Sequence, residues 1–122
     1  MPRVVHFDIG VEDPERAIKL YTELLGWHIH KWEGPMDYWL ITTGKQSEPG
    51  INGGLAKRQD PSEFTLNTIG IPSVDEFIEK ITAAGGKVLQ PKMAIPGVGW
   101  YTTCQDTEGN AFGLMEEDES AK

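Results

Sequence analysis

The order of apolar and polar positions along the chain predicts the same succession of elements twice. Residues 3–11 are rich in β-branched side chains and predict a strand. A helix over 14–25 is predicted next, because Asp13 and Pro14 are typical of a helix start and Gly26 of a helix end. Three shorter strands, separated by turn residues, are predicted after the helix, over 27–32, 38–43 and 51–57. The first half therefore has the pattern of one βαβββ unit.

The second half repeats this order. A strand over 64–71 leads to Ser73, which has the spacing of a capping box with Glu76, so that each side chain would accept a hydrogen bond from the other residue's backbone N–H. The helix that begins there is predicted to end at Gly85 and Gly86. Three strands are predicted after it, over 87–90, 99–104 and 110–116.

A shift of 60 residues superposes the two halves without a gap. It pairs identical residues at corresponding places, among them Ile9 with Ile69, Gly10 with Gly70, and Gly26 with Gly86. Residues 58–63 form a polar hinge that is too short for a flexible linker. We therefore expect one domain over 1–122 with a frayed acidic tail at 117–122. Its two modules are expected at 3–57 and 64–117.

Composition disfavours several classes of function. The net charge of -8 argues against nucleic acid and anionic membranes as partners, because both need a cationic surface. No apolar run approaches the roughly 20 residues that span a bilayer, and the first residues enter a strand pattern rather than a signal peptide. We therefore expect a cytoplasmic protein. The single cysteine, Cys104, has no disulfide or CxxC partner, and a buried, unreactive thiol is favoured over a nucleophile.

Four segments of the sequence follow a known family pattern. They are VVHFDIGVEDPERAIKLYTELLGW, DYWLITTG, GINGGL and AAGGKVLQPKMAIPGVGWYTTCQDTEGNAFGLME. In these segments the chain resembles the vicinal oxygen chelate superfamily, which includes glyoxalase I, extradiol dioxygenases and bleomycin resistance proteins. More narrowly, it looks like a single-domain group described as predicted enzymes related to lactoylglutathione lyase. Thr107 stands where the turn before the last strand often has proline.

The resemblance implies an α+β fold, the glyoxalase/bleomycin resistance/dihydroxybiphenyl dioxygenase fold. In this fold two βαβββ modules form a curved mixed sheet around a pocket, and such proteins usually form homodimers. Fold carries over between relatives more safely than activity does. The identity of the ligand therefore has to come from the site.

The resemblance also implies positions for a metal. Glyoxalase-type members hold a divalent ion with four side chains, one from the first and one from the last strand of each module. In this sequence the four positions are His6, Gly53, Leu66 and Gly113. Only the imidazole can ligate, whereas a catalytic zinc-like site needs about three protein ligands. We therefore expect no bound metal or other cofactor.

The three histidines are not equivalent. His28 and His30 alternate with apolar residues, so we expect both imidazoles to face solvent or a subunit interface. Side chains two apart on a strand share a face, which places the carboxylate of Asp8 beside the imidazole of His6. Two interpretations of that pair stay open. It could carry out proton transfer near neutral pH, or the two groups could simply satisfy each other's hydrogen bonds.

Aromatic side chains supply flat surfaces of the kind that line small-molecule sites. Two adjacent pairs occur, Tyr38 with Trp39 and Trp100 with Tyr101, and one member of each should point inward. The sequence does not decide which, and we take the two tryptophans as the candidates. The expected lining of the pocket is Trp39, Gly53, Leu66, Thr68, Trp100 and Gly113. The loop before Trp100 could act as a flap, or it could be a plain surface loop.

Two functions of different classes are compatible with these residues. The first is a metal-independent enzyme, of lyase or isomerase type, that acts on a small molecule through His6 and Asp8. The second is a non-catalytic protein that binds and sequesters a small ligand, as the bleomycin resistance relatives do. A metal-dependent glyoxalase or lyase ranks third, because that reaction relies on an ion to stabilise an enediolate.

Overall fold

The computed structural model describes residues 2–59 and 65–122 and divides them into two compact units. Unit 2 is His6–Leu66, and unit 1 combines the residues up to Val5 with Asn67–Lys122. Each unit contains one helix and strands in the predicted order, which confirms the α+β class. Most of the predicted hinge at 58–63, and the first residue of the strand predicted at 64–71, lie outside the described residues.

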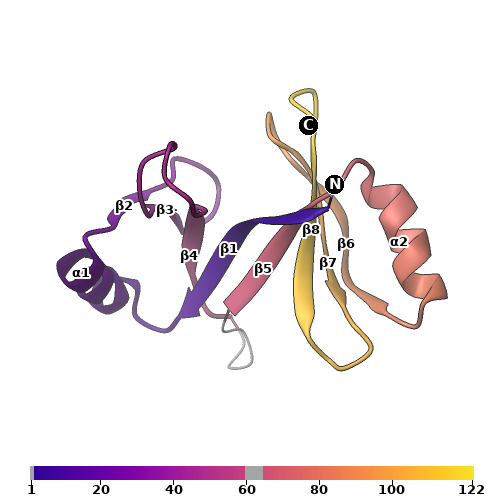
Figure 1. Cartoon of the computed structure of the whole chain (residues 1–122), viewed down its shortest axis with the longest axis horizontal. Helices are drawn as coiled ribbons and strands as arrows, with labels where there is room; N and C mark the ends of the chain where they lie inside the picture. Colours follow the sequence, from indigo (N-terminus) through magenta and orange to yellow (C-terminus); the bar gives the residue numbers. More distant parts are fainter. Residues whose placement is uncertain (1, 60–64) are drawn as a thin grey trace. The chain divides into compact units, whose positions relative to one another are not determined.

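Unit 2 follows the sequence prediction closely. Its elements are β1 (Arg3–Val11), α1 (Pro14–Leu25), β2 (His28–Lys31), β3 (Tyr38–Thr42) and β4 (Gly53–Lys57), with the first residues of β1 belonging to unit 1. The strand order in the unit is β2-β3-β4-β1, and β4 runs parallel to β1 (Figure 1). Asp13 begins the helix by accepting a hydrogen bond from the backbone of Arg16, and Gly26 ends it in the left-handed region at φ 71°.

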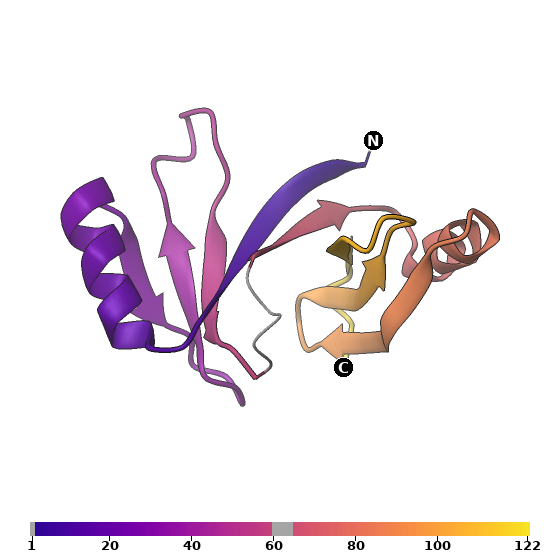
Figure 2. The same ribbon diagram turned by 90° about the horizontal axis from the view of Figure 1, so that it is seen from below.

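Helix α1 covers one face of the unit 2 strands (Figure 2). The ring of Trp27 stacks on Tyr21 of α1 at 5.1 Å and lies 6.1 Å from the ring of Phe7 in β1. Phe7 therefore points toward the helix. Because neighbouring residues of a strand face opposite sides, His6 and Asp8 point to the face that α1 leaves uncovered.

Unit 1 has the order β5-β8-β7-β6. Its elements are β5 (Thr65–Gly70), whose first residues fall in unit 2, α2 (Val74–Ala83), β6 (Lys87–Ile95), β7 (Gly99–Gln105) and β8 (Ala111–Glu117). Strand β6 is longer than the predicted 87–90. Its pairing with β7 shifts register twice, between Val88 and Met93, and then continues to Ile95.

The predicted capping box of α2 forms only in part. The side chain of Ser73 accepts a hydrogen bond from the backbone N–H of Glu76 at 3.2 Å, as expected. The carboxylate of Glu76 instead pairs with Lys80, 3.1 Å away. The backbone N–H of Val74 donates to the carboxylate of Glu116 on β8 at 2.9 Å. A strand side chain therefore supplies a cap that the helix sequence does not.

Unit 1 has a core of buried apolar side chains. It joins Ile71, Val74, Cys104 and Leu114, with Trp100 packed against it. The acidic tail is not frayed: Ala121 is 3% exposed, and its carbonyl oxygen accepts a hydrogen bond from the backbone of Gly97. A turn at Asp118 brings the end of the chain back onto the β6–β7 connection, because its backbone N–H donates to Val98.

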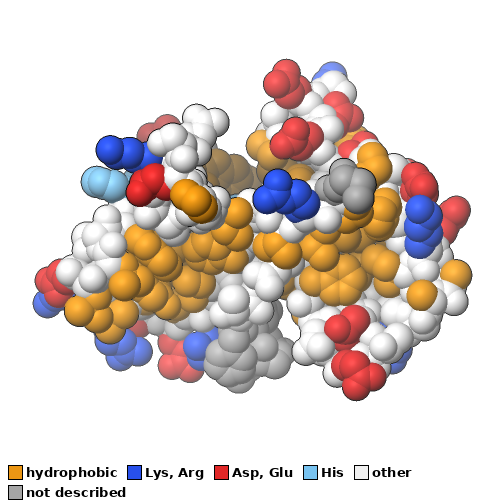
Figure 3. All heavy atoms as spheres, viewed as in Figure 1, with side chains coloured by type: hydrophobic (Ala, Val, Ile, Leu, Met, Phe, Trp, Pro, Cys, Tyr) orange, Lys and Arg blue, Asp and Glu red, His pale blue; other side chains and the backbone are white. Residues whose placement is uncertain are grey.

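Apolar side chains also remain on the surface of both units. They include Leu20, Leu24 and Leu25 on α1 and Val88, Leu89 and Met93 on β6. Figure 3 shows apolar surface over each unit on the face drawn there. Within residues 2–59 and 65–122, neither helix has the length and hydrophobicity needed to cross a membrane. The charged residues of α1 and α2 lie toward solvent.

Acid should weaken the turn that precedes β8. The carboxylate of Asp106 accepts hydrogen bonds from the backbone of Glu108 at 2.8 Å and from the backbone and side chain of Asn110 at 2.9 and 3.0 Å. The hydrogen bonds from Asn110, more than that from Glu108, hold the pKa of Asp106 below its ordinary 3.8. The stabilisation is therefore complete above pH 3.8 and is lost as the pH falls through the lowered pKa.

We predict that Asp106→Asn lowers the urea midpoint at pH 7 and makes that midpoint depend less on pH in the acid range. Glu119→Gln removes an exposed carboxylate of the same unit and is the matched control. An Asp106→Asn midpoint equal to that of the control across the whole pH series would contradict the role given to this carboxylate.

Candidate functional site

Three polar side chains of unit 2 meet on the face opposite α1. The Nε2 atom of His6 lies 3.2 Å from Oδ1 of Asp8 and 2.8 Å from the hydroxyl of Tyr38. The same hydroxyl donates a 2.5 Å hydrogen bond to Oδ1 of Asp8. The predicted pairing of His6 with Asp8 is therefore confirmed, and Tyr38 joins it. We call these three residues the His6 cluster.

The His6 cluster is half-open to solvent. The side chains of His6 and Asp8 are 33% and 29% exposed. Part of the imidazole is therefore accessible to solvent. At the same time, two hydrogen-bonding partners hold the ring, which is the arrangement that an acid–base group needs.

A glycine in β4 makes room for Tyr38. The register places Gly54 opposite Asp8 on one side and opposite Leu40 on the other, while Tyr38 lies opposite Ala56. A Cβ atom at position 54 would overlap the hydroxyl and ring of Tyr38. The tyrosine therefore crosses diagonally over Gly54 to reach β1, which a side chain at position 54 would prevent.

Unit 1 contains the same arrangement with different chemistry. Gly113 of β8 lies opposite Thr68 of β5, and the hydroxyl of Tyr101 covers it from β7. Thr68 stands where unit 2 has Asp8. The residue is 2% exposed, and its hydroxyl has no hydrogen-bond partner among the described residues. Both units therefore place a tyrosine over a glycine, but only unit 2 adds a carboxylate and an imidazole.

The choice of aromatic residues made from the sequence is wrong in both pairs. Trp39 lies opposite Leu55 and Lys31, on the face of unit 2 away from His6. Trp100 packs against the core of unit 1, and its Nε1 donates to Asp118 at 3.1 Å. Lys92 also lies over its ring, 4.7 Å from the centroid. These contacts fix Trp100 in place, so it does not act as a flap.

The constant shift of 60 residues explains this error. It holds from Asp13 to Ser73 at the helix starts. The left-handed glycines that follow the helices, Gly26 and Gly85, are already 59 residues apart. Tyr38 and Tyr101, which cover equivalent glycines, are 63 apart because the chain segments before β3 and β7 differ in length. The two units therefore do not superpose without gaps.

The same slip affects one other candidate, Gly53. Gly53 lies opposite Phe7, on the helix-facing side of unit 2, so Gly54 rather than Gly53 shares the face of His6. Leu66 is half-buried at the end of unit 2 and offers only hydrocarbon. A tyrosine side chain covers each of the two glycines on these faces, Gly54 and Gly113.

The residues around His6 do not fit a divalent metal site. Its Nε2 atom is engaged by Asp8 and Tyr38, and the β4 residue opposite Asp8 is a glycine, which has no side chain to ligate an ion. Residues 2–59 and 65–122 contain no group of three or more His, Cys, Asp or Glu side chains that could surround an ion. About three such ligands are needed. We therefore derive no chemical step that passes through a metal.

Comparison with known proteins establishes the family. A sequence model of the Glyoxalase/Bleomycin resistance protein/Dioxygenase superfamily matches residues 3–114. The chain belongs to this superfamily. No curated protein matches the sequence. Membership agrees with the fold of both units but leaves the reaction open.

Several solved structures are similar in fold to this superfamily member. A Streptomyces coelicolor methylmalonyl-CoA epimerase in complex with 2-nitronate-propionyl-CoA has a TM-score of 0.71 at 18% identity, covering 98% of this chain and 97% of its own. The epimerase from Mycobacterium tuberculosis scores 0.67 at 16% identity, covering 93% and 87%. A hypothetical protein from Bacillus halodurans scores 0.72 at 15% identity, covering 99% and 98%. At these identities the comparison concerns the fold.

The remaining candidates lie apart from the His6 cluster. His28 and His30 are exposed on β2, as predicted. Cys104 is fully buried, and desolvation raises the pKa of its thiol.

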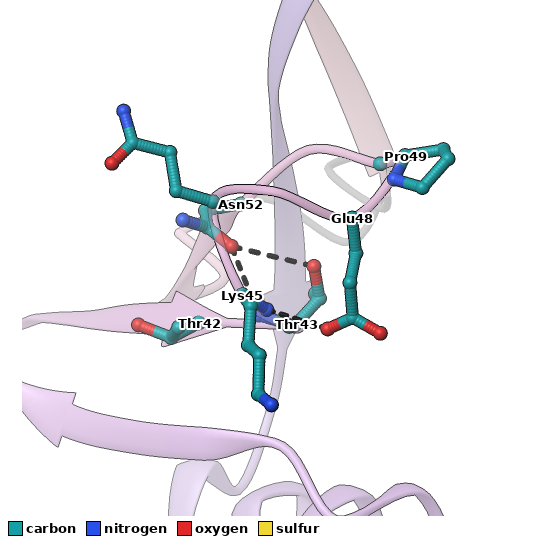
Figure 4. A pocket seen from close by; sticks show the side chains of 9 residues that line it. Thr42, Thr43, Lys45, Glu48, Pro49 and Asn52 are labelled. Atoms are coloured by element: carbon teal, nitrogen blue, oxygen red, sulfur yellow. Dashed lines mark hydrogen bonds between the residues drawn. The ribbon is translucent and has the colours of Figure 1, made fainter.

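A separate cavity of about 480 Å³ lies under the β3–β4 connection (Figure 4). Hydrogen bonds from Thr43 to Asn52 and from Lys45 to Glu48 close its walls, and it contains no residue of the His6 cluster.

Two adjacent glycines provide a test of this geometry. A Cβ atom at position 53 would overlap the carbonyl oxygen of Phe7, which cannot move without breaking the β1–β4 pairing. The atoms nearest to a Cβ atom at position 54 would belong to the side chain of Tyr38, which can rotate away. We predict that Gly53→Ala costs about 1–3 kcal/mol of unfolding free energy. Gly54→Ala should cost less but separate Tyr38 from His6.

Urea unfolding measures the loss of unfolding free energy. The NMR contact between the rings of His6 and Tyr38 measures whether Tyr38 stays beside His6. The contact should persist in Gly53→Ala and disappear in Gly54→Ala. A Gly54→Ala variant that keeps the contact would show that Tyr38 does not depend on this glycine.

Proposed function

We propose that this protein is a metal-independent enzyme that moves a proton on a small, carbonyl-containing molecule, with His6 as the proton-transfer group. The observation that carries the proposal is the hydrogen-bonded His6 cluster, in which a partly exposed imidazole is held by a carboxylate and a phenol. An oriented imidazole can accept and return a proton near neutral pH.

The proposed reaction needs only these side chains for the proton. His6 accepts a proton from a carbon next to the carbonyl as the C–H bond breaks, and the electron pair stays on the substrate as an enolate. The imidazolium that forms is stabilised by the negative charge of Asp8, 3.2 Å away. After the planar enolate has turned over in the site, the same imidazolium returns the proton to the opposite face of that carbon, so the centre is inverted and no external acid is required.

The similar solved structures favour isomerisation over bond cleavage. Some of them are epimerases, and inversion of a carbon centre beside a carbonyl proceeds by removal and return of a proton. Two of these epimerases are complexes with 2-nitronate-propionyl-CoA and with methylmalonyl-CoA. This chain carries a net charge of -8, which repels a polyanion. We therefore propose a substrate with little negative charge.

A non-catalytic binding protein is the second candidate. One observation favours it: Asp8 already accepts hydrogen bonds from both Tyr38 and His6, so the His6 cluster is satisfied without any reaction. The superfamily also takes part of its name from bleomycin resistance proteins. On this proposal the uncovered face of unit 2 binds a small molecule and leaves it unchanged.

A ligand screen followed by turnover separates the two candidates. Melting temperatures measured against a panel of small carbonyl compounds identify ligands, because selective binding to the native state raises the melting temperature. With a ligand in hand, we predict that His6→Ala lowers kcat about 10²–10⁴-fold and still shows the shift in melting temperature. His28→Ala removes an exposed imidazole of the same unit and should behave as the wild type. Binding without turnover in the wild type would establish the second candidate, and unchanged turnover in His6→Ala would exclude the first.

A further inference from the structure

The hydroxyl of Tyr38 lies between two groups of the His6 cluster. It is 2.5 Å from Oδ1 of Asp8 and 2.8 Å from Nε2 of His6. A phenol has one proton to donate and accepts through its oxygen, whereas an ionised carboxylate only accepts. The proton of Tyr38 therefore belongs to the short contact with Asp8, since two bare oxygen lone pairs at that distance would repel.

This assignment fixes the proton on His6. The oxygen of Tyr38 has already used its proton, so it can only accept at the contact with Nε2. Asp8, 3.2 Å from the same nitrogen, also accepts. Both neighbours of Nε2 are therefore acceptors, and a neutral imidazole has only one proton to place. That proton is on Nε2, and the lone pair is on Nδ1.

We infer that Tyr38, acting with Asp8, fixes the tautomer of His6, so that Nδ1 is the basic nitrogen of the site. The part of this inference that concerns catalysis rests on the proposed function. Among the described residues, no hydrogen bond engages Nδ1. The lone pair is therefore free to take a proton, while the other side of the ring stays anchored.

The proton step can be written with named atoms. As the substrate C–H bond breaks, an N–H bond forms at Nδ1 and the electron pair remains on the substrate. The imidazolium keeps its Nε2 proton in the hydrogen bonds to Tyr38 and Asp8, so the positive charge faces the carboxylate. The N–H bond at Nδ1 then breaks to return the proton. Tyr38 is a positioning residue, because its proton stays with Asp8 throughout.

Nitrogen NMR of the His6 ring tests the tautomer without any substrate. At a pH where the ring is neutral, the wild type should show Nε2 protonated and Nδ1 bare, and Tyr21→Phe should match it. Tyr21 is the control because it is a tyrosine of the same unit that stacks on Trp27, outside the His6 cluster. In Asp8→Asn, Tyr38 loses its ionised acceptor and can donate to Nε2, so the form protonated on Nδ1 should appear.

Each result of the NMR experiment decides the inference. A wild-type ring protonated on Nδ1 would overturn it, because Tyr38 would then be donating to His6. An Asp8→Asn spectrum identical to that of the wild type would overturn it too, since Asp8 would not be directing the proton of Tyr38. Wild-type protonation on Nε2, lost in part in Asp8→Asn, supports it.

Kinetics with the ligand found above extend the test to catalysis. Tyr38→Phe should lower kcat about 10- to 100-fold, because a ring held less firmly is displaced from the reacting carbon. KM should change less than about twofold, since Tyr38 does not touch substrate. Equal kcat in Tyr38→Phe and Tyr21→Phe would show that Tyr38 does not position the ring of His6. Absence of turnover in the wild type would count against the proposed function and leave the NMR result standing.

Discussion

The hydroxyl of Tyr38 can reach Asp8 and His6 only because residue 54 has no side chain. The glycine at position 54 of β4 lets the phenol lie across that strand, from β3 to β1. The carboxylate of Asp8 then has two hydrogen-bonding neighbours on its own face of the sheet. The orientation of His6, the tautomer inferred for it and the proposed proton transfer all depend on this single close approach.

Unit 1 contains the same close approach of a tyrosine to a glycine, and this pair shows how the two modules have diverged. Tyr101 covers Gly113 as Tyr38 covers Gly54, but the neighbouring position is Thr68 instead of a carboxylate. A buried hydroxyl can donate one hydrogen bond and accept two, but it carries no charge, so it stabilises an imidazolium less than a carboxylate does. The chain has therefore kept the backbone geometry of both modules while placing the titratable groups in one.

The sequence predicts the helices and β1 well because their signals are local. Asp13, Pro14 and Gly26 each act within a turn of the residue that they define, and alternation along β1 is enough to pair His6 with Asp8. The aromatic assignments fail because they depend on cross-strand register, which is set by loop lengths that a constant shift of 60 ignores. Tyr38 could have been found by treating each module separately, since a glycine next to an aromatic-rich strand indicates a close approach.

Superfamily membership raises the question of a metal. Within the described residues the donor set around His6 does not fit one, because the imidazole is bound by protein groups and too few other ligands surround it. Elemental analysis of the protein purified without added metal tests this most directly. The account predicts far less than one equivalent of any divalent ion per chain, with no difference between the wild type and His6→Ala. One equivalent in the wild type that is lost in His6→Ala would contradict it.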